Sequence, residues 1–477
     1  MIEIVYKDDV HLQVRCDSSV AQELSDFFTF DVPGAKFMPQ VRNRVWDGKI
    51  RLFNSVTRTV YTGLKDYIVD FCKVRKYDCI VDDKLTNTTP FSTEDVDDLA
   101  KTLKLTMEPR DYQKDAVAHA ITNKRAMMIS PTASGKSMII YMIARYYPMK
   151  KLIIVPTTGL VAQLASDFHE YGYKDDIHKI TAGASKDIDS EITITTWQSI
   201  YKMPRKWFEQ FQVVIGDEAH LFKAKSLTSI MEKCTEAEYR IGTTGTLDGT
   251  QTHQLVLEGL FGPVHKVTTT KDLIDSDQLA KLDIKMLLLK YKDEHCKEIS
   301  KLKYQEEIDF IVRYTPRNNF ISNLAIDQEG NTLILFNYVE KHGKPLHNIL
   351  KEKLKGKDRK LFYVSGETDV DTRERVRAIT EKEQNAIIVA SLGTFSTGIN
   401  IKRLHNLIFA SPSKSQIRVL QSIGRGLRKS DKDTIVYDIA DDLHWKQKKN
   451  YTLEHAAERI KIYSKEKFDY ELFEINI

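Results

Sequence analysis

The chain has 477 residues, of which 42% are hydrophobic and 29% charged, and its formal net charge is +4. This length exceeds one ordinary domain, so we expect two or three, and the net charge alone does not identify a polyanionic partner. No apolar run approaches the roughly 20 residues of a membrane span, and Lys7, Asp8 and Asp9 interrupt any signal-peptide core. We therefore expect a soluble cytoplasmic protein.

The first 105 residues are predicted to form a small α+β domain. Alternating apolar residues indicate strands at 2–6 and 11–15, and helical periodicity indicates helices at 19–28 and 65–76. A turn-rich segment, 31–63, separates them. Polar residues at 82–93 predict a surface linker, after which 93–103 is expected to be one capped helix.

After residue 106 the pattern changes to short apolar strands that alternate with glycine-bearing loops and helices. Strands are predicted at 126–129, 152–155, 192–195, 213–215 and 239–243, with helices such as 137–147 and 160–171 between them. A second series of strands is predicted at 333–336, 361–364, 386–390, 407–409 and 434–437. Short strands that alternate with helices indicate a parallel sheet covered by helices on each side, here formed twice.

The expected domain boundaries follow from these changes of pattern. They are 1–105 for the N-terminal domain, 106–265 for the first lobe, 266–331 for a bridging segment, 332–444 for the core of the second lobe and 445–477 for a C-terminal helical segment. The last segment is charged and fits against either lobe.

Residues 130–137, S-P-T-A-S-G-K-S, stand between a predicted strand and a predicted helix. Backbone N–H groups at a helix N-terminus bind anions, and a lysine placed there reaches the β- and γ-phosphates of a nucleotide. The expected ATP contacts are Ser134, Gly135, Lys136 and Ser137, with the Ser137 hydroxyl as a ligand of Mg(II). G-K-S alone is common by chance, so the flanking strand and helix carry the prediction. Ser130 replaces the usual first glycine.

The D-E-A-H sequence at 217–220 follows an apolar strand, so its acids emerge at the carboxyl edge of the sheet, where ligands bind. Asp217 is expected to hold Mg(II), and Glu218 to orient and deprotonate the attacking water.

Arg425 and Arg428 are three residues apart on a predicted helix and face the same side. Arginines of a second lobe can neutralise charge on the γ-phosphoryl group when the lobes close, which predicts catalytic and nucleotide-binding roles. A solvated basic helix face is the alternative, and the adjoining Gln421 and Gly424 favour the nucleotide role.

Five further segments stand in order along the chain: R-D-Y-Q at 110–113, V-P-T-T-G-L-V-A-Q at 155–163, T-T-W-Q-S at 195–199, T-T-G-T-L at 243–247 and A-S-L-G-T-F-S-T-G-I-N-I at 390–401. Together with the segments above, they resemble the motif series of superfamily 2 helicases. The resemblance implies an α/β fold of two tandem RecA-like lobes of the P-loop NTPase type. It implies a contact of Gln113 with adenine, of Thr157, Thr195, Trp197 and Ser391 with a nucleic-acid strand, and of Gly398 with ATP. Asn400 replaces the usual acid, which leaves the contact at that position open.

W-D-G-K-I-R at 46–51, E-P-R-D-Y-Q-K-D-A-V at 108–117 and G-A-S-K-D at 183–187 are similar to the UvsW helicase family of T-even-like bacteriophages. That resemblance spans the N-terminal domain and both lobes. It implies an ATP hydrolase that unwinds or branch-migrates forked DNA, Holliday junctions and R-loops with 3′-to-5′ polarity, in phage recombination, repair and replication. The expected partners are branched DNA and RNA–DNA hybrids, the expected cofactors are ATP and Mg(II), and a monomer is expected.

The N-terminal domain contains a cluster of basic and aromatic residues. Its members are Lys36, Arg42, Arg44, Lys49, Arg51 and Arg58, interleaved with Phe37, Trp46 and Phe53. Basic side chains can follow phosphates while an aromatic ring stacks on an unpaired base. We expect DNA contacts from Arg44, Trp46, Lys49 and Arg51, although Trp46 fits the core of a small domain equally well.

Two other functions fit the same motifs. An RNA helicase would use the same backbone-tracking contacts. An ATP-switched annealing or binding module would hydrolyse ATP only to reset its affinity, without unwinding.

Overall fold

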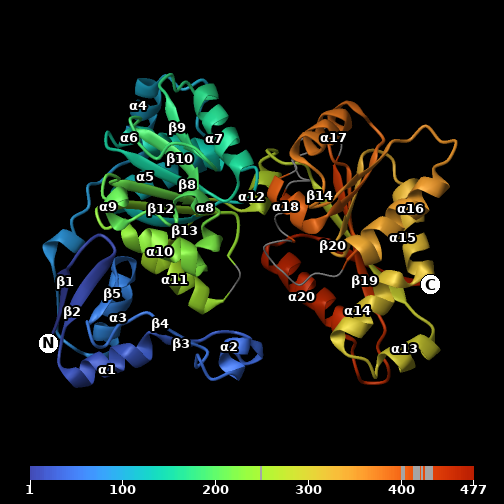
Figure 1. The fold of residues 1–477 in the computed structure, drawn as a ribbon, viewed down its shortest axis with the longest axis horizontal. Helices are drawn as coiled ribbons and strands as arrows, with labels where there is room; N and C mark the ends of the chain where they lie inside the picture. The colour runs from blue at the N-terminus through green and yellow to red at the C-terminus, as the bar shows by residue number, and fades with distance from the viewer. Residues whose placement is uncertain (248–249, 399–402, 412–418, 420–422, 425–432) are drawn as a thin grey trace. The chain divides into compact units, whose positions relative to one another are not determined.

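The computed structural model covers residues 1–477 and describes all of them except 248–249, 399–402, 412–418, 420–422 and 425–432 (Figure 1). The chain divides into two compact units. Unit 1 comprises Met1–Ser130 and Gly135–Thr268, and unit 2 comprises Pro131–Ser134 and Thr269–Ile477. No helix among the described residues is long and apolar enough to cross a bilayer.

The N-terminal part of unit 1 is a small mixed sheet with two helices. Its strand order is β5-β2-β1-β6, with β1 (Ile2–Tyr6), β2 (His11–Arg15), β5 (Thr59–Tyr61) and β6 (Cys79–Val81). The apolar residues of β1 and β2 alternate with period two, so one face of the sheet is buried against α1 (Ser18–Phe27) and α3 (Lys65–Arg75).

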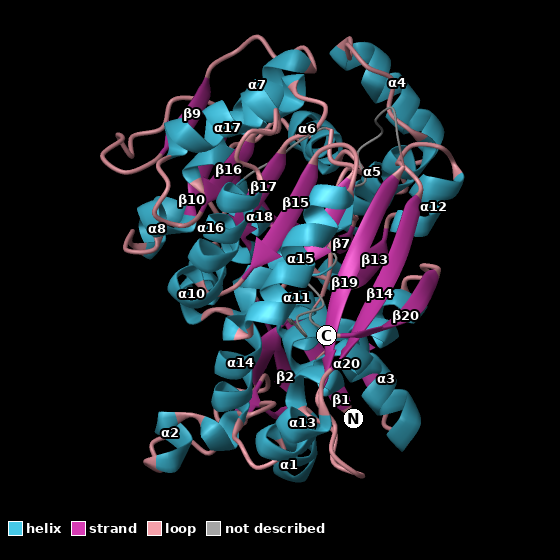
Figure 2. Cartoon of the chain, turned by 90° about the vertical axis from the view of Figure 1, so that its right-hand side faces the viewer, coloured by secondary structure: helices cyan, strands magenta, loops and turns pink. Residues whose placement is uncertain are grey.

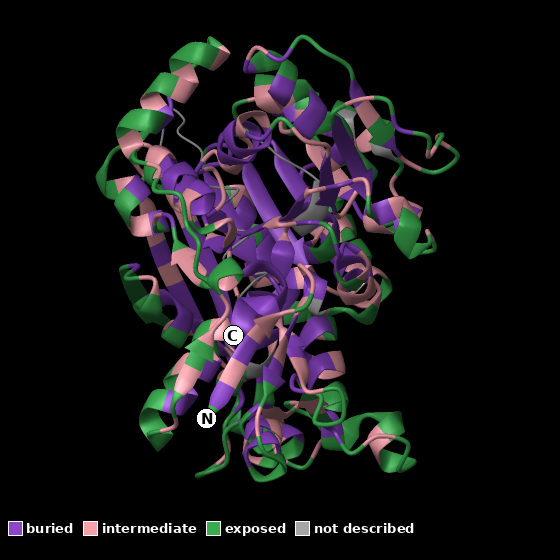
Figure 3. Ribbon diagram, turned by 90° about the vertical axis from the view of Figure 1, so that its left-hand side faces the viewer, coloured by how far each residue is buried: buried purple, intermediate pink, exposed green. Residues whose placement is uncertain are grey.

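A separate two-stranded ribbon carries a protruding segment of this domain. The ribbon consists of β3 (Thr29–Asp31) and β4 (Lys49–Arg51), and between them lie a short 3-10 turn, Ala35–Phe37, and α2 (Pro39–Arg42). We call residues 29–51 the arm. Figure 3 shows it at the lower right, coloured as largely exposed.

The rest of unit 1 is a parallel sheet of seven strands in the order β13-β7-β12-β11-β8-β10-β9. The strands are β7 (Arg125–Ile129), β8 (Lys151–Val155), β9 (Ile177–Ile180), β10 (Ile192–Thr196), β11 (Val213–Asp217), β12 (Tyr239–Thr244) and β13 (Val264–Lys266). The helices are α4 (Thr93–Leu103), α5 (Asp111–Asn123), α6 (Lys136–Tyr146), α7 (Thr158–Glu170), α8 (Trp197–Ile200), α9 (Arg205–Phe208), α10 (Lys225–Lys233) and α11 (Gln251–Phe261). Because the central strands are buried on both faces, they read in the sequence as continuous apolar runs.

Unit 2 contains a second parallel sheet of seven strands, in the order β16-β17-β15-β18-β19-β14-β20 (Figure 2). The strands are β14 (Leu282–Lys290), β15 (Thr332–Phe336), β16 (Leu361–Val364), β17 (Ile387–Ser391), β18 (Asn406–Phe409), β19 (Thr434–Asp442) and β20 (Tyr470–Asn476). The helices are α12 (Thr270–Asp275), α13 (Asp293–Ile299), α14 (Tyr304–Arg313), α15 (Thr315–Asp327), α16 (Lys344–Lys353), α17 (Val370–Lys382), α18 (Leu392–Gly398) and α20 (Tyr451–Lys465). Two parallel sheets after a small mixed-sheet domain confirm the predicted fold class.

The C-terminal segment completes the second sheet. The sequence predicted a helical segment at 445–477, but its end forms strand β20. This strand pairs in parallel with β14, and β14 pairs with β19. The carboxylate of Glu307 on α14 accepts hydrogen bonds from the backbone N–H groups of Tyr451 (3.0 Å) and Thr452 (2.8 Å). A carboxylate at a helix N-terminus accepts from the unpaired backbone N–H groups and interacts favourably with the positive end of the helix dipole. Glu307 therefore fixes α20 to unit 2.

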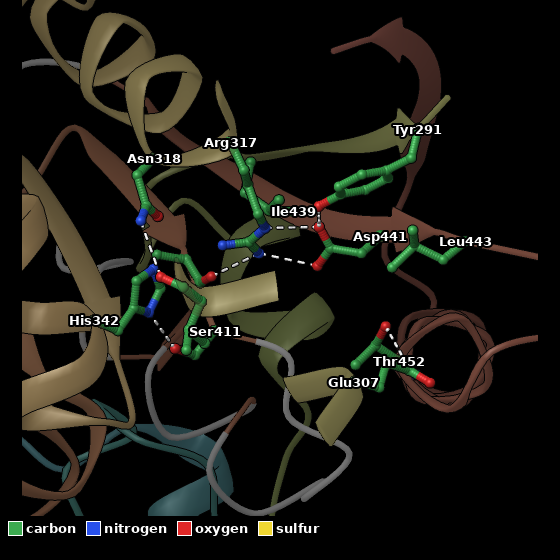
Figure 4. A network of polar contacts seen from close by, with 12 residues as sticks. Tyr291, Glu307, Arg317, Asn318, His342, Ser411, Ile439, Asp441, Leu443 and Thr452 are labelled. Carbon is green, nitrogen blue, oxygen red and sulfur yellow. Dashed lines mark hydrogen bonds and ion pairs between the residues drawn. The ribbon is translucent and has the colours of Figure 1, made fainter. Parts of the chain in front are cut away.

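A buried ion pair holds the centre of unit 2 together (Figure 4). Both side chains are fully buried, and the Arg317 guanidinium donates to the two carboxylate oxygens of Asp441 at 2.6 and 2.9 Å. Arg317 also donates to the carbonyl of Ala410 (2.8 Å), and His342 hydrogen-bonds Ser411 (Nδ1 to Oγ, 2.9 Å). Burial holds the pKa of His342 well below its usual range. These contacts anchor the end of β18, from which the chain continues towards the predicted arginine pair.

The N-terminal domain is joined to the first parallel sheet through α11. A Cβ atom at Gly63 would come within 2.0 Å of the carbonyl oxygen of Glu258, so only glycine allows the approach. Tyr67 Oη donates to Glu258 Oε2 (2.6 Å), and Tyr61 Oη donates to Glu232 Oε1 (2.7 Å). The two parts of unit 1 are thus packed backbone against backbone.

Gly63→Ala is expected to loosen this contact, because forcing atoms into a filled space typically costs about 1–3 kcal/mol. The expected result is faster proteolytic cleavage in the exposed segment 86–90 and a lower melting temperature. Gly366→Ala is the control, because a Cβ atom there meets nothing within 4 Å. Equal cleavage rates in the two variants would contradict the contact.

Candidate functional site

The phosphate loop connects β7 to α6 at the carboxyl edge of the first sheet. Gly135 has φ 76° and Ala133 has φ 67°, both in the left-handed region, and α6 begins directly afterwards at Lys136. Backbone N–H groups at the start of a helix form a site for anions, and this loop leads directly into one. Ser134 is buried, and its hydroxyl donates to the carbonyl of Pro131 (2.6 Å).

Gln113 lies against this loop. Its Oε1 accepts from the backbone N–H of Arg110 (2.9 Å), and its Nε2 donates to the carbonyl of Gly135 (3.4 Å). A Cβ atom at position 135 would come within 2.4 Å of Nε2 and displace the Gln113 side chain, and the left-handed φ also favours glycine. The structure therefore brings the predicted base contact next to the predicted phosphate contacts.

Two carboxylates end strand β11 near the lysine of the phosphate loop. Glu218 Oε1 lies 3.9 Å from Lys136 Nζ, and Asp217 Oδ1 accepts from the Thr243 hydroxyl (2.9 Å). Burial and the neighbouring Glu218 charge raise the pKa of Asp217, while Lys136 and the Thr243 hydrogen bond oppose the shift. Glu218 has φ 50°, a sparsely populated conformation for a residue with a side chain, of the kind found at functional sites.

The D-E-A-H segment is hydrogen-bonded to the T-T-G-T-L segment. His220 Nδ1 lies 3.3 Å from Glu218 Oε2 and 2.9 Å from Thr244 Oγ1, and Thr244 Oγ1 donates to the carbonyl of Thr246 (3.1 Å). Strands β11 and β12 are neighbours in register, with Asp217 opposite Thr243. Two hydrogen bonds, Asp217–Thr243 and His220–Thr244, thus connect the D-E-A-H segment to residues 243–247.

Ser137 has a partner that sequence reasoning missed. Its Oγ lies 2.7 Å from the hydroxyl of Tyr171, the residue that ends α7. Thirty-four positions separate the two residues, and no motif links them. Among the residues that the structure describes, no group of three or more His, Cys, Asp or Glu could hold a metal by itself. One hydroxyl and one carboxylate fit a cation completed by phosphate oxygens and water, as Mg(II) prefers.

The expected strand contacts of the lobes differ in exposure. Thr157 is partly exposed and caps α7, its Oγ1 accepting from Leu160 N (3.3 Å). Ser391 ends β17, and its Oγ lies 2.6 Å from Thr394 Oγ1. Trp197 is partly exposed at the start of α8, and Gly398 ends α18.

Thr195 is less accessible than the other expected strand contacts. Its side chain is fully buried inside the sheet, and its hydroxyl donates to the carbonyl of Ile180 (3.1 Å). The predicted contact of Thr195 with a strand stays a prediction. The exposed side chain of this segment is Gln198. The predicted Arg425 and Arg428, with Gln421 and Asn400, lie outside the described residues.

The basic cluster of the N-terminal domain lies mainly on the arm. Arg44, Lys49 and Arg51 are exposed, and Arg51 is paired with Asp47 (2.5 Å). Trp46 is half-buried, and its indole N–H donates to the carbonyl of Lys49 (2.9 Å). Arg58 is instead bonded to the carbonyl of Cys16 on the domain body.

Family models match three consecutive parts of the chain. They are the N-terminal domain of the DNA helicase UvsW over residues 1–82, the res subunit of type III restriction enzymes over 106–249, and the helicase conserved C-terminal domain over 316–430. With two tandem all-parallel sheets and a phosphate loop next to D-E-A-H, they define an ATP-dependent helicase of superfamily 2, which is an ATP hydrolase.

The ATP-dependent DNA helicase uvsW of Enterobacteria phage T4 is 37% identical to this chain over 506 aligned positions that cover 100% of both proteins. The crystal structure of T4 UvsW matches 100% of this chain and 99% of its own, with a TM-score of 0.53 and 35% identity. The chain therefore belongs to the UvsW helicase family, which confirms the resemblance seen in the sequence. A more distant relative is the DNA 3′-5′ translocase XPB2 of Sulfurisphaera tokodaii, 25% identical over 77% of this chain and 88% of the relative.

Gly135→Ala is expected to weaken ATP binding, since the added methyl group meets Gln113 and disfavours the left-handed backbone. Equilibrium binding of a fluorescent ATP analogue measures the effect, and a loss of at least about tenfold is expected, equivalent to roughly 1.4 kcal/mol. Gly159→Ala, in α7 after β8, is the control because a Cβ atom at position 159 would lie at an ordinary distance of 4.0 Å from its nearest neighbour, Thr157 Oγ1. Undiminished binding by Gly135→Ala would contradict this arrangement of the loop.

Proposed function

We propose that this helicase translocates 3′-to-5′ and unwinds or branch-migrates forked DNA, Holliday junctions and R-loops. The observation that carries the proposal is the basic arm on an N-terminal domain packed against the sheet that holds the phosphate loop. The T4 relative is named a DNA helicase and the archaeal relative a DNA 3′-5′ translocase, which supports DNA as substrate and the stated polarity. We assign the motor to a monomer acting in the cytoplasm of a phage-infected host.

The ATP-site residues have distinct proposed roles. Gln113 holds the adenine base, the backbone of Ser134 and Gly135 holds phosphate oxygens, and Lys136 neutralises the β- and γ-phosphates. Ser137 and Asp217 would hold Mg(II), which when bound offsets the charge of the phosphate oxygens. Tyr171 orients the Ser137 hydroxyl, and Gly398 approaches the nucleotide from the second lobe.

Hydrolysis requires a water molecule activated near the γ-phosphate. Glu218 orients this water and accepts its proton, and its position between Lys136 and His220 holds the carboxylate in place. Arg425 and Arg428 would neutralise the charge that develops on the γ-phosphoryl group. The hydrogen bonds Asp217–Thr243 and His220–Thr244 then transmit the loss of the γ-phosphate to 243–247.

Movement along DNA would follow from alternating grips on one strand. Thr157 and Trp197 hold it on the first lobe and Ser391 on the second, while Arg44, Trp46, Lys49 and Arg51 hold the branch. The proposed domain limits are 1–105, 106–265, 266–331, 332–444 and 445–477. Within these limits β14, from the bridging stretch, contributes to the second sheet.

Glu218→Gln is expected to retain ATP and DNA binding and to lose turnover by about 10²- to 10⁴-fold, because the amide cannot accept the proton of water. Steady-state ATPase with saturating DNA measures turnover, and nucleotide binding is measured separately. Glu236→Gln, an exposed position of the same lobe, is the control. Normal turnover by Glu218→Gln would refute the assignment.

Replacing Arg44, Lys49 and Arg51 with alanine is expected to weaken binding to forked DNA and to reduce the slope of log affinity against log salt by about 2–3, since each phosphate contact contributes about 0.9. Replacing Lys7, Arg15 and Lys73 removes equal charge from the domain body and controls for net charge. If both triple variants change the slope equally, the arm has no specific role.

ATPase stimulation by single-stranded DNA, duplex, fork, four-way junction, R-loop and RNA tests the substrate. Strand displacement on matched forks distinguishes unwinding from ATP-switched annealing. Stimulation by RNA alone would assign an RNA helicase.

A further inference from the structure

The arm presents large apolar side chains to solvent. Phe37 is 65% exposed, Met38 40% and Val45 79%. All three lie within nine consecutive residues, beside the ribbon β3–β4 that holds the arm. A cluster of this kind marks a surface that is covered in function rather than a random exposed residue.

The arm has its own small packed interior, from which these side chains are excluded. Ala35 is buried, and a Cβ atom at Gly48 would lie 3.0 Å from the Ala35 Cβ and 3.6 Å from Val41 Cγ2. Backbone hydrogen bonds fix the loop around this interior, including Val32 N to Gly48 O (2.8 Å) and Val45 N to Gln40 O (2.9 Å). The exposure of the apolar side chains is therefore set by the local fold.

The charge of the arm selects the class of partner. Residues 31–51 contain five basic side chains and two acidic ones, and one of the two acids, Asp47, is already paired with Arg51. The Lys36 ammonium lies over the Phe37 ring at 5.1 Å from its centroid. Apolar side chains rimmed by cations fit a polyanion with apolar faces, which is the chemistry of a duplex end with exposed bases.

The structure also distinguishes the three aromatic residues of the cluster. Phe53 is only 2% exposed and belongs to the domain core. Trp46 is half-buried and its indole N–H is bonded to the carbonyl of Lys49. Phe37 alone of these three combines high exposure with a position among the exposed basic residues.

We propose that Phe37, flanked by Met38 and Val45, is an apolar wedge that packs against the terminal base pair of a duplex at a DNA branch. Lys36, Arg42, Arg44 and Lys49 hold the adjoining phosphates. This inference rests on the proposed action on branched DNA and specifies the residue that meets the bases.

The attachment of the arm suits a wedge. Leu52, directly after β4, is buried, and its N–H donates to the carbonyl of Phe28 (3.0 Å) in the domain body. That body is packed through Gly63 against α11 of the motor sheet. Force from translocation of the first lobe would therefore reach the wedge without an intervening flexible linker.

The test uses the full-length protein and a forked DNA with 2-aminopurine in the base pair next to the branch. Phe37→Ala is expected to bind this fork about tenfold more weakly, as the loss of one stacking contact predicts, and to lose the fluorescence change at the branch. Phe37→Trp is expected to restore both. The melting temperature of Phe37→Ala should equal that of the wild type, because this side chain is 65% exposed.

Val45→Ser and Val74→Ser form a matched pair, since both side chains are 79% exposed in the same domain and only Val45 is on the arm. Weaker fork binding by Val45→Ser alone supports the wedge. Wild-type fork binding and fluorescence by Phe37→Ala, or equal effects of the two valine variants, overturn it and leave a protein-docking role for the patch. If the wild-type ATPase responds to no DNA, the proposed function itself fails, which is a separate readout.

Discussion

The close packing of α11 is the constraint on which the organisation of unit 1 depends. A Cβ atom at Gly216 would lie 2.8 Å from the Phe261 ring of this helix, and a Cβ atom at Gly242 would lie 2.9 Å from the same ring. These glycines directly precede Asp217 and Thr243, which end neighbouring strands in the ATP site. On the N-terminal side, Gly259 of the helix leaves room for Tyr61. One helix thus contacts the strands that lead to the D-E-A-H carboxylates and to 243–247, and also the domain that carries the arm. Because these contacts have no free space, a shift of the strand ends displaces the helix.

Charged side chains are concentrated at the carboxyl edge of the first sheet, where Lys136, Asp217 and Glu218 lie close together. Asp217 is partly buried beside Glu218, and its pKa is raised because its ionised form is disfavoured there. The stability cost of ionising Asp217 is absent at pH values below the unfolded pKa and grows as pH rises through the raised folded pKa. Lys136 and the Thr243 hydroxyl offset part of this cost, and a bound cation would offset more. A positive charge next to Asp217 would therefore favour its ionised form.

Unit 2 uses buried charge differently. The Arg317–Asp441 pair is satisfied on both oxygens of the carboxylate, and Glu307 accepts from the start of α20. Burying a charged group costs free energy, and removing one partner of a buried pair strongly destabilises the folded protein. These contacts therefore favour one arrangement of β18, β19 and the C-terminal helix. This arrangement positions the start of the segment that leads to the two predicted arginines.

The sequence by itself determined the two parallel sheets, the phosphate loop and the D-E-A-H carboxylates, because buried strands, loop glycines and catalytic side chains leave local patterns. It predicted the N-terminal strands for the same reason. Only the tertiary structure decided the partners that are distant in the chain. Tyr171 meets Ser137, Gly63 meets α11, β20 joins the second sheet beside β14, and Thr195 turns inward. Likewise, the sequence shows three aromatic residues among the basic side chains, but only the structure shows that Phe37 is exposed whereas Trp46 and Phe53 are partly or fully buried. Such outcomes depend on which surfaces fill the same space, and contacts across the fold have no period or spacing that a linear sequence displays.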